Sequence, residues 1–140
     1  MKYLFAILFA GIAFGIVSGS HPEAYCINKH KDTDFECIVH CKFKHYNFVD
    51  EKYNIRDSHI RNLSNFLIRY NVIQANKRID VEKHLKSCIE QSLKKAKKSS
   101  CDTIFTYYMC ITDEKLVHFD NYDRAIKLYD QTIYVVSRRN

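Results

Sequence analysis

The chain of 140 residues is poor in the residues that form tight turns. Its single proline is Pro22, and its three glycines all lie within the first 19 residues. Because two-residue β-hairpins depend on positive φ angles, which glycine supplies, this composition disfavours an all-β domain after residue 20. The same region also lacks an apolar run of the length that crossing a membrane needs. These absences indicate a helical domain without membrane insertion.

Residues 1–20 have the pattern of a secretory signal peptide. Lys2 precedes an apolar run over residues 3–17, and small residues occupy positions 18–20. A membrane anchor is the alternative, but the run contains two glycines and is shorter than the roughly 20 apolar residues of a span. We therefore expect cleavage after position 19 or 20 and secretion of one domain, residues 21–140, large enough to bury a core of its own.

Basic residues outnumber acidic ones. The chain has 22 lysines and arginines against 16 aspartates and glutamates, a formal net charge of +6. Loss of Lys2 with the signal peptide lowers this value by only one unit, so the positive charge belongs to the secreted domain. A charge of this sign favours anionic partners and says nothing about the fold.

All the cysteines follow the predicted signal peptide. An even number of cysteines in a secreted chain indicates three disulfides, with fifteen alternative pairings. A metal site in the segment CIVHC, residues 37–41, is the alternative, but secreted thiols normally oxidise and no second ligand pair has zinc-like spacing. We therefore predict no metal site. The six cysteines are Cys26, Cys37, Cys41, Cys88, Cys101 and Cys110.

No catalytic motif is recognisable. His40 lies in a segment faintly similar to that of secreted phospholipases A2, but Cys41 stands where those enzymes have an aspartate. No glycine is present after residue 19 to build their calcium loop, and a Gly-x-Ser-x-Gly motif is absent. We predict that the protein is not an enzyme and uses no cofactor.

Apolar residues recur at helical spacing along most of the chain. The segment YNFVDEKYNI, residues 46–55, has no clear period and is predicted to be a connection. Thr33 and Glu36 have the spacing of a capping box, and Ser99 or Ser100 is suited to cap a later helix. The pattern predicts a compact all-α domain of about six helices. They are expected over residues 22–31, from Thr33 through Cys41, from Ser58 to Tyr70, over 76–98, from Ser100 through Tyr108, and over 122–136.

Lysines gather on one side of the predicted helix 76–98, opposite the apolar side that carries Val81 and Leu85. A solvated helix end is the alternative interpretation. The segment KKAKK is typical of heparin-binding clusters, and a linear polyanion releases counterions at each contact. Glu90 interrupts this lysine face. We predict a polyanion-binding surface composed of Lys83, Lys86, Lys94, Lys95, Lys97 and Lys98, extended by Arg138 and Arg139 if the C-terminus lies nearby.

A second basic group is brought together if Cys26 bonds Cys41. It is either a second contact surface or an ordinary solvated one, and charge patterns alone favour the latter. Its members are Lys29, His30, Lys31, Lys42, Lys44 and His45.

Aromatic residues at inward-facing positions offer an alternative site for a small hydrophobic or amine ligand. At helical spacing such residues more often form the core. No acidic residue is evident on an inward face of the predicted helices, so we rank this pocket second to the basic surface. Its residues are Phe66, Tyr70, Phe105, Tyr108, Tyr122 and Tyr129.

The cysteine spacing C-x10-C-x3-C-x46-C-x12-C-x8-C resembles that of the insect odorant-binding protein superfamily. The resemblance implies an odorant-binding-like fold with first-to-third, second-to-fifth and fourth-to-sixth bridges. Ten residues between the first two cysteines are fewer than is usual in that family, which implies a truncated first helix. The implied disulfides are Cys26–Cys41, Cys37–Cys101 and Cys88–Cys110.

The segments HPEAYC, CIVHCKFKHYNFVD, KHLKSC and CDTIFTYYMC are similar to those of the small, fifteen-kilodalton salivary proteins of blood-feeding sand flies. That resemblance implies secretion in saliva and a role against host haemostasis. We therefore expect an anticoagulant protein that covers heparin-like polysaccharide or polyphosphate and so inhibits contact activation of clotting. A small-ligand carrier is the alternative function, and intracellular nucleic acid is not an expected partner.

Overall fold

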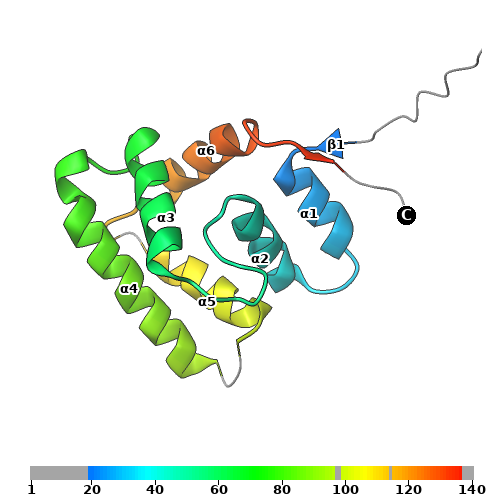
Figure 1. Ribbon diagram of the computed structural model, residues 1–140, viewed down its shortest axis with the longest axis horizontal. Helices are drawn as coiled ribbons and strands as arrows, with labels where there is room; N and C mark the ends of the chain where they lie inside the picture. Colours follow the sequence, from blue (N-terminus) through cyan, green and yellow to red (C-terminus); the bar gives the residue numbers. More distant parts are fainter. Residues whose placement is uncertain (1–18, 97–98, 114, 137–140) are drawn as a thin grey trace, which may run out of the picture.

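The computed structural model describes residues 19–96, 99–113 and 115–136 (Figure 1). Six α-helices make up most of this part of the chain, which confirms the predicted all-α class. The predicted signal peptide therefore lies outside the described residues, except for positions 19 and 20. The elements are β1 (Gly19–Ser20), α1 (Pro22–His30), α2 (Phe35–His45), α3 (Asp57–Arg69), the 3₁₀-helix η1 (Ala75–Lys77), α4 (Arg78–Lys95), α5 (Cys101–Ile111), α6 (Phe119–Asp130) and β2 (Val135–Val136).

The last helix ends earlier than its periodicity predicts. Residues 131–136 were expected to continue it, but α6 ends at Asp130. The amide of Ile133 then bonds the carbonyl of Asp130 in a turn, and Val135 and Val136 form β2. Adjacent β-branched residues favour extended backbone, and β2 finds a partner in β1, with which it pairs antiparallel.

Two other predicted boundaries also shift. The N-cap of α2 is Asp34, whose carboxylate accepts a hydrogen bond from the amide of Glu36 at 3.3 Å. Thr33 instead donates its hydroxyl to the carbonyl of His30, so the predicted capping box at Thr33 is wrong. The helix predicted over 76–98 is α4, which ends at Lys95, because Ala96 is extended. The expected cap at Ser100 is confirmed, since its amide donates to the Thr103 hydroxyl at 3.2 Å.

Within the described residues, three positions take the left-handed conformation, and none of them is a glycine. Asn47 follows α2 with φ of 60°, and Asn71 follows α3 with φ of 56°. Asparagine tolerates this region better than most residues, so both helices end in turns without glycine. The third is Tyr53, in the connection between α2 and α3, where Asp50 accepts hydrogen bonds from the amides of Lys52 and Asn54.

Three disulfides join the helices with the pairing that the resemblance implied. Cys26–Cys41 ties α1 to α2, Cys37–Cys101 ties α2 to α5, and Cys88–Cys110 ties α4 to α5. Helix α5 is thereby held at one end to α2 and at the other to α4. The nine-residue α1 is the truncated first helix that the cysteine spacing implied.

The core lies between the inner faces of α2–α6, around fully buried residues such as Leu63, Leu85 and Tyr107. At one end of the core, the buried carboxylate of Asp130 accepts a hydrogen bond from the amide of Glu23 at 2.9 Å. A carboxylate at a helix N-terminus satisfies a free amide and is favoured by the helix dipole. The end of α6 therefore fixes the start of α1.

Candidate functional site

The predicted lysine face consists of exposed side chains along α4. Lys83 and Lys94 are 11 residues apart, which places them about 20° apart in angle and roughly 16 Å apart along the helix. Lys95 is exposed about 100° further round the helix, and Lys86 lies on the other flank. The remaining predicted residues, Lys97, Lys98, Arg138 and Arg139, lie outside the described residues.

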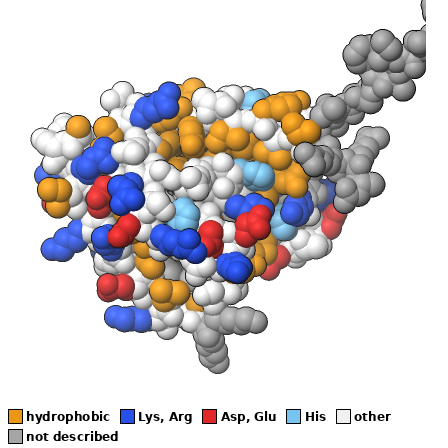
Figure 2. All heavy atoms as spheres, in the orientation of Figure 1, with side chains coloured by type: hydrophobic (Ala, Val, Ile, Leu, Met, Phe, Trp, Pro, Cys, Tyr) orange, Lys and Arg blue, Asp and Glu red, His pale blue; other side chains and the backbone are white. Residues whose placement is uncertain are grey.

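Acidic residues interrupt this face. The ammonium of Lys86 lies 3.2 Å from the carboxylate of Asp57 on α3, and by helical spacing Glu90 falls about 20° from Lys83. Figure 2 shows basic and acidic side chains mixed over α3 and α4. Within the described part of the chain, Lys83, Lys94 and Lys95 form no ion pair. The lysine face is thus a row of separated cations and not a continuous stripe.

The structure separates Lys42 from the other members of the second basic group. Lys42 is turned towards α1, where its ammonium lies 2.7 Å from the carboxylate of Glu23. The other members are exposed or half-buried near the ends of α1 and α2, which the Cys26–Cys41 disulfide joins. We call this set the α1–α2 basic face. It contains Lys29, His30, Lys31, Lys44 and His45.

Ring contacts connect the two helices across this face. The Lys29 ammonium lies 5.8 Å from the centre of the Tyr25 ring, and that ring meets the His45 ring edge to face at 5.4 Å. Lys44 pairs with Glu51 at 3.4 Å, but Glu51 is 82% exposed, so solvent screens this pair. Figure 2 shows histidine and lysine side chains beside each other over α1 and α2, with some acidic side chains among them.

Both histidines of the α1–α2 basic face favour the neutral form. Burial, followed by the charge of Lys29, lowers the pKa of His30 below 6.5. Burial, followed by the charges of Lys44 and Lys29, lowers the pKa of His45 in the same way. A positive charge beside an imidazole disfavours its protonation. The lysine charges therefore add to the effect of burial at both histidines.

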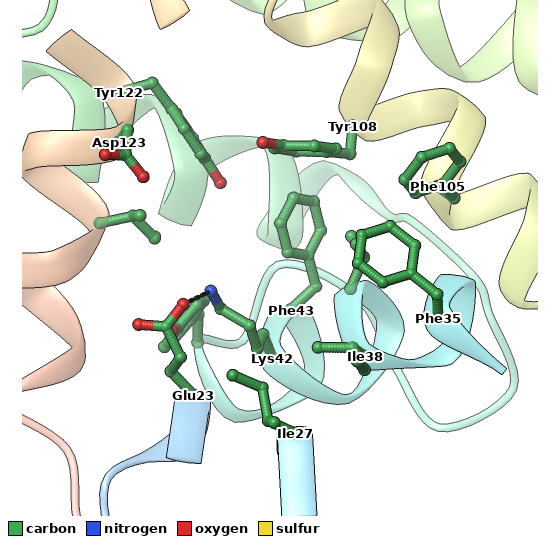
Figure 3. A pocket seen from close by; sticks show the side chains of 13 residues that line it. Glu23, Ile27, Phe35, Ile38, Lys42, Phe43, Phe105, Tyr108, Tyr122 and Asp123 are labelled. Atoms are coloured by element: carbon green, nitrogen blue, oxygen red, sulfur yellow. Dashed lines mark hydrogen bonds and ion pairs between the residues drawn. The ribbon is translucent and has the colours of Figure 1, made fainter. Parts of the chain in front are cut away.

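A cavity of about 250 Å³ lies on the other side of α2, between α1, α5 and α6 (Figure 3). Three of the six aromatic residues predicted to form a pocket line it, namely Phe105, Tyr108 and Tyr122. Most of the remaining wall comes from α2, including Phe35 and Phe43.

The other three predicted pocket residues do not line the cavity and form a neighbouring ring cluster, which meets the cavity wall where Phe66 lies 6.0 Å from Tyr122 between ring centres. Phe66 lies 5.2 Å from Tyr129 and 5.3 Å from Tyr70, measured between ring centres. Tyr122 and Tyr129 share one side of α6, but seven residues separate them by roughly 10 Å along the helix. Helical spacing therefore predicted correctly that Tyr122 and Tyr129 share one side of α6. Their different positions along the helix axis place only Tyr122 in the cavity wall.

The polar groups of the cavity are mostly paired. Glu23 is bound by Lys42, and Asp123 by Lys127 at 2.7 Å. Among the buried polar atoms of the cavity wall, the exception is Tyr122, whose hydroxyl has no hydrogen-bond partner within the described residues and points into the cavity in Figure 3. Burial raises the pKa of Tyr122 well above 10, so this hydroxyl remains a neutral donor.

Sequence reasoning missed the two carboxylates of the cavity, Glu23 and Asp123. Glu23 lies three residues before Cys26, and Lys42 directly follows Cys41, so the disulfide itself brings the ion pair together. The pairing of cysteines was the signal that would have found this contact. Nothing in the local pattern around Asp123 marks it as a cavity residue.

Potential metal ligands do not form a usable site in the described chain. The ligand atoms of Cys26, Cys41 and His45 lie within 4.8 Å of one another, but both sulfurs belong to one disulfide and are not thiolates. His40, the other histidine that the sequence singled out, contacts the carbonyl of Asp50 at 3.1 Å through Nε2. Its ring lies against Tyr53, so it has a packing role.

Within the described residues, no helix combines the length and the apolarity that crossing a membrane requires.

Comparison with known proteins places the chain among insect proteins of this fold. The PBP/GOBP family model matches residues 21–114. Ayaconin of Lutzomyia ayacuchensis is 37% identical over 132 residues, covering 94% of this chain and 92% of its own. Salivary proteins 15a and 15b of Phlebotomus duboscqi are 38% and 34% identical over 142 aligned positions, covering 96% of this chain and all of theirs. The chain therefore belongs to the PBP/GOBP family, with sand fly salivary proteins as relatives.

Proposed function

We propose that this protein is secreted in saliva and binds anionic polymers, such as heparin-like polysaccharide or polyphosphate, thereby inhibiting contact activation of coagulation. The observation that carries the proposal is the row of exposed lysines on α4, of which Lys83, Lys94 and Lys95 have no acidic partner among the described residues. The names of the relatives, which describe salivary proteins, support the setting. Three disulfides are typical of chains that leave the reducing cytosol.

The mechanism requires many weak contacts and no catalytic site. Each lysine that neutralises a sulfate or phosphate releases a condensed counterion, and these gains add along a linear polymer. Separated cations suit a flexible polymer, which adjusts its path between them. A polymer covered in this way no longer presents the charged template on which clotting zymogens assemble.

Heparin binding across a salt series tests the proposal. The triple variant Lys83→Ala, Lys94→Ala and Lys95→Ala should reduce the magnitude of the slope of log affinity against log salt by about 0.7 to 0.9 per lost contact. The matched control is Lys77→Ala, Lys115→Ala and Lys127→Ala, which removes the same charge at lysines already paired with aspartates. Equal losses in the two triple variants would mean that net charge, and not the α4 row, governs binding.

Clotting times then test the consequence. The protein should prolong clotting started by a charged surface, added excess polymer should reverse the effect, and clotting started by tissue factor should be unchanged. A protein that blocks a shared protease would prolong both, which would contradict the template mechanism.

A small-ligand site is the second candidate, favoured by the unpaired hydroxyl of Tyr122. A cavity of 250 Å³ lies below the roughly 300–1,000 Å³ of drug-sized pockets, which limits a ligand to about one ring. Because Lys42 and Lys127 already neutralise the two carboxylates, an uncharged molecule with one hydrogen-bond acceptor fits better than an amine.

Calorimetric titration with acetophenone and with phenethylamine tests the cavity. Acetophenone should bind, and Tyr122→Phe should weaken it about 2- to 10-fold by removing one hydrogen bond. Tyr70→Phe, in the neighbouring ring cluster and not in the cavity wall, should bind like the native protein. Tighter binding of phenethylamine would identify an amine site instead, and no binding of either compound would rule out ligands of this size.

A further inference from the structure

The α1–α2 basic face places two histidines, from two different helices, close to its lysines. His30 and His45 belong to different helices, yet the charges of Lys29 and Lys44 act on both. The disulfide between Cys26 and Cys41 fixes the two helices together, so this arrangement is part of the folded structure.

Acidic groups near these histidines do not cancel the lysines. Asp34 acts on His30, but it is exposed and caps α2 by accepting the amide of Glu36. Asp130 acts on His45, but it is buried and already accepts hydrogen bonds from the hydroxyl of Tyr46 and the amide of Glu23.

His40 is the third histidine of this region. The charges of Lys44 and His30 lower its pKa, and Asp50 raises it. Burial is the main cause that lowers the pKa of His40, and its ring is engaged with Tyr53 and with the carbonyl of Asp50. At His30 and at His45, two lysines lower the pKa and one aspartate raises it. Together with burial, the lysines keep both histidines neutral in the free protein.

We propose that the α1–α2 basic face binds a sulfated or phosphorylated polymer and that binding tightens as His30 and His45 take up protons. This inference rests on the proposed function, to which it adds a second contact surface and a dependence on acidity. His30, half-buried at the end of α1, contacts the polymer, while His45 contributes through its charge because its Nε2 is buried.

The coupling follows from linkage. The polymer brings negative charge to a region where the lysines disfavour imidazolium, so it raises the proton affinity of both histidines. Proton affinity and polymer affinity must then rise together. Because the pKa values of both histidines are lowered in the free protein, the histidines are neutral at pH 7.5, and the gain appears at lower pH, where the complex takes up protons before the free protein does. Between these pH values the sulfates of heparin stay ionised, so any gain comes from the protein.

The experiment measures heparin affinity at pH 7.5 and pH 5.5 at constant ionic strength, with circular dichroism confirming that the protein is folded at both. The native protein should bind more tightly at pH 5.5, by at most about tenfold for each pKa unit by which the polymer raises one histidine. His30→Gln with His45→Gln should abolish most of that gain. His118→Gln, at the start of α6, is the matched control and should keep the full gain.

A lysine pair tests the surface itself. Lys29→Ala with Lys44→Ala should weaken binding at both pH values more than Lys77→Ala with Lys115→Ala, which removes the same charge elsewhere. An undiminished gain in the double histidine variant, or equal losses in the two lysine pairs, would overturn the inference while leaving polymer binding in place. Absence of heparin binding by the native protein at both pH values would overturn the inference and the proposed function together.

Discussion

The hydroxyl of Tyr46, the residue that directly follows α2, donates a hydrogen bond to the buried carboxylate of Asp130, at the end of α6. The same carboxylate accepts the amide of Glu23, so one acidic side chain connects three helices. Burial, together with this hydrogen bond, raises the pKa of Tyr46 far above its usual value, so the tyrosine remains a donor at all ordinary pH values. These contacts fix the position of α1, which contributes residues both to the cavity wall and to the α1–α2 basic face.

Replacing Asp130 with alanine should destabilise the fold by about 2–3 kcal/mol. The change leaves the Tyr46 hydroxyl buried without its acceptor and removes the cap of α1. Urea unfolding measures the loss. Asp32→Ala, in the exposed turn after α1, should stay within about 0.5 kcal/mol of the native protein. Similar losses in the two variants would show that the Asp130 contacts add little.

Removal of each disulfide by paired cysteine-to-alanine changes should cost stability in order of loop length. The sequence separations are 15, 22 and 64 residues, for which loop entropy gives about 3.0, 3.4 and 4.3 kcal/mol. Loss of Cys37–Cys101 should therefore be the most damaging. Denaturant unfolding of the three double variants checks the order, and a larger loss for Cys26–Cys41 than for Cys37–Cys101 would contradict it.

The left-handed turn at Asn71 predicts a response to side-chain size. Asn71→Ala should destabilise by about 1 kcal/mol, because a Cβ without a compensating polar group disfavours positive φ. Asn71→Gly should be neutral or slightly stabilising. Thermal unfolding compares them with Asn28→Ala, at an exposed helical position of α1, which should change stability little. A tolerated alanine at position 71 would mean that the turn relaxes.

Stability should fall on mild acidification, in part through His59. Its Nδ1 accepts the amide of Arg56 at 3.0 Å, which requires an unprotonated nitrogen. Burial lowers the pKa of His59 in the folded protein below 6.5, so the unfolded chain binds this proton first. The contribution of His59 to the free energy of unfolding is therefore complete above about pH 7. It decreases as the pH falls below 6.5, by at most about 1.4 kcal/mol per pH unit for one proton.

Urea unfolding at pH 7.5, 6.5 and 5.5 measures this decrease. His59→Asn keeps an acceptor but does not titrate, so its stability should fall less over the same range. A decrease as steep as that of the native protein would assign the effect to the other histidines with lowered pKa values, His30, His40 and His45.

Helical periodicity predicted the number of helices and most of their buried faces, because each apolar stripe is a local property of the chain. It failed after Asp130, where Ile133 and Val136 keep the helical spacing but lie beyond the helix end. Near the end of α4, the apolar side chain of Leu93 is 52% exposed. Periodicity carries no signal for where neighbouring elements stop covering a helix.

The amino-acid sequence by itself determined the helical class, the even set of cysteines and the positive charge, because these follow from composition and from the spacing of residues along one helix. The tertiary structure decided which charges are free and which are paired. Lys86 meets Asp57, Lys42 meets Glu23, and the six predicted pocket residues divide between a cavity and a ring cluster. Helical phase fixes the direction of a side chain from its own axis, but its partners depend on how separate helices are placed, and packing and the disulfides set that placement.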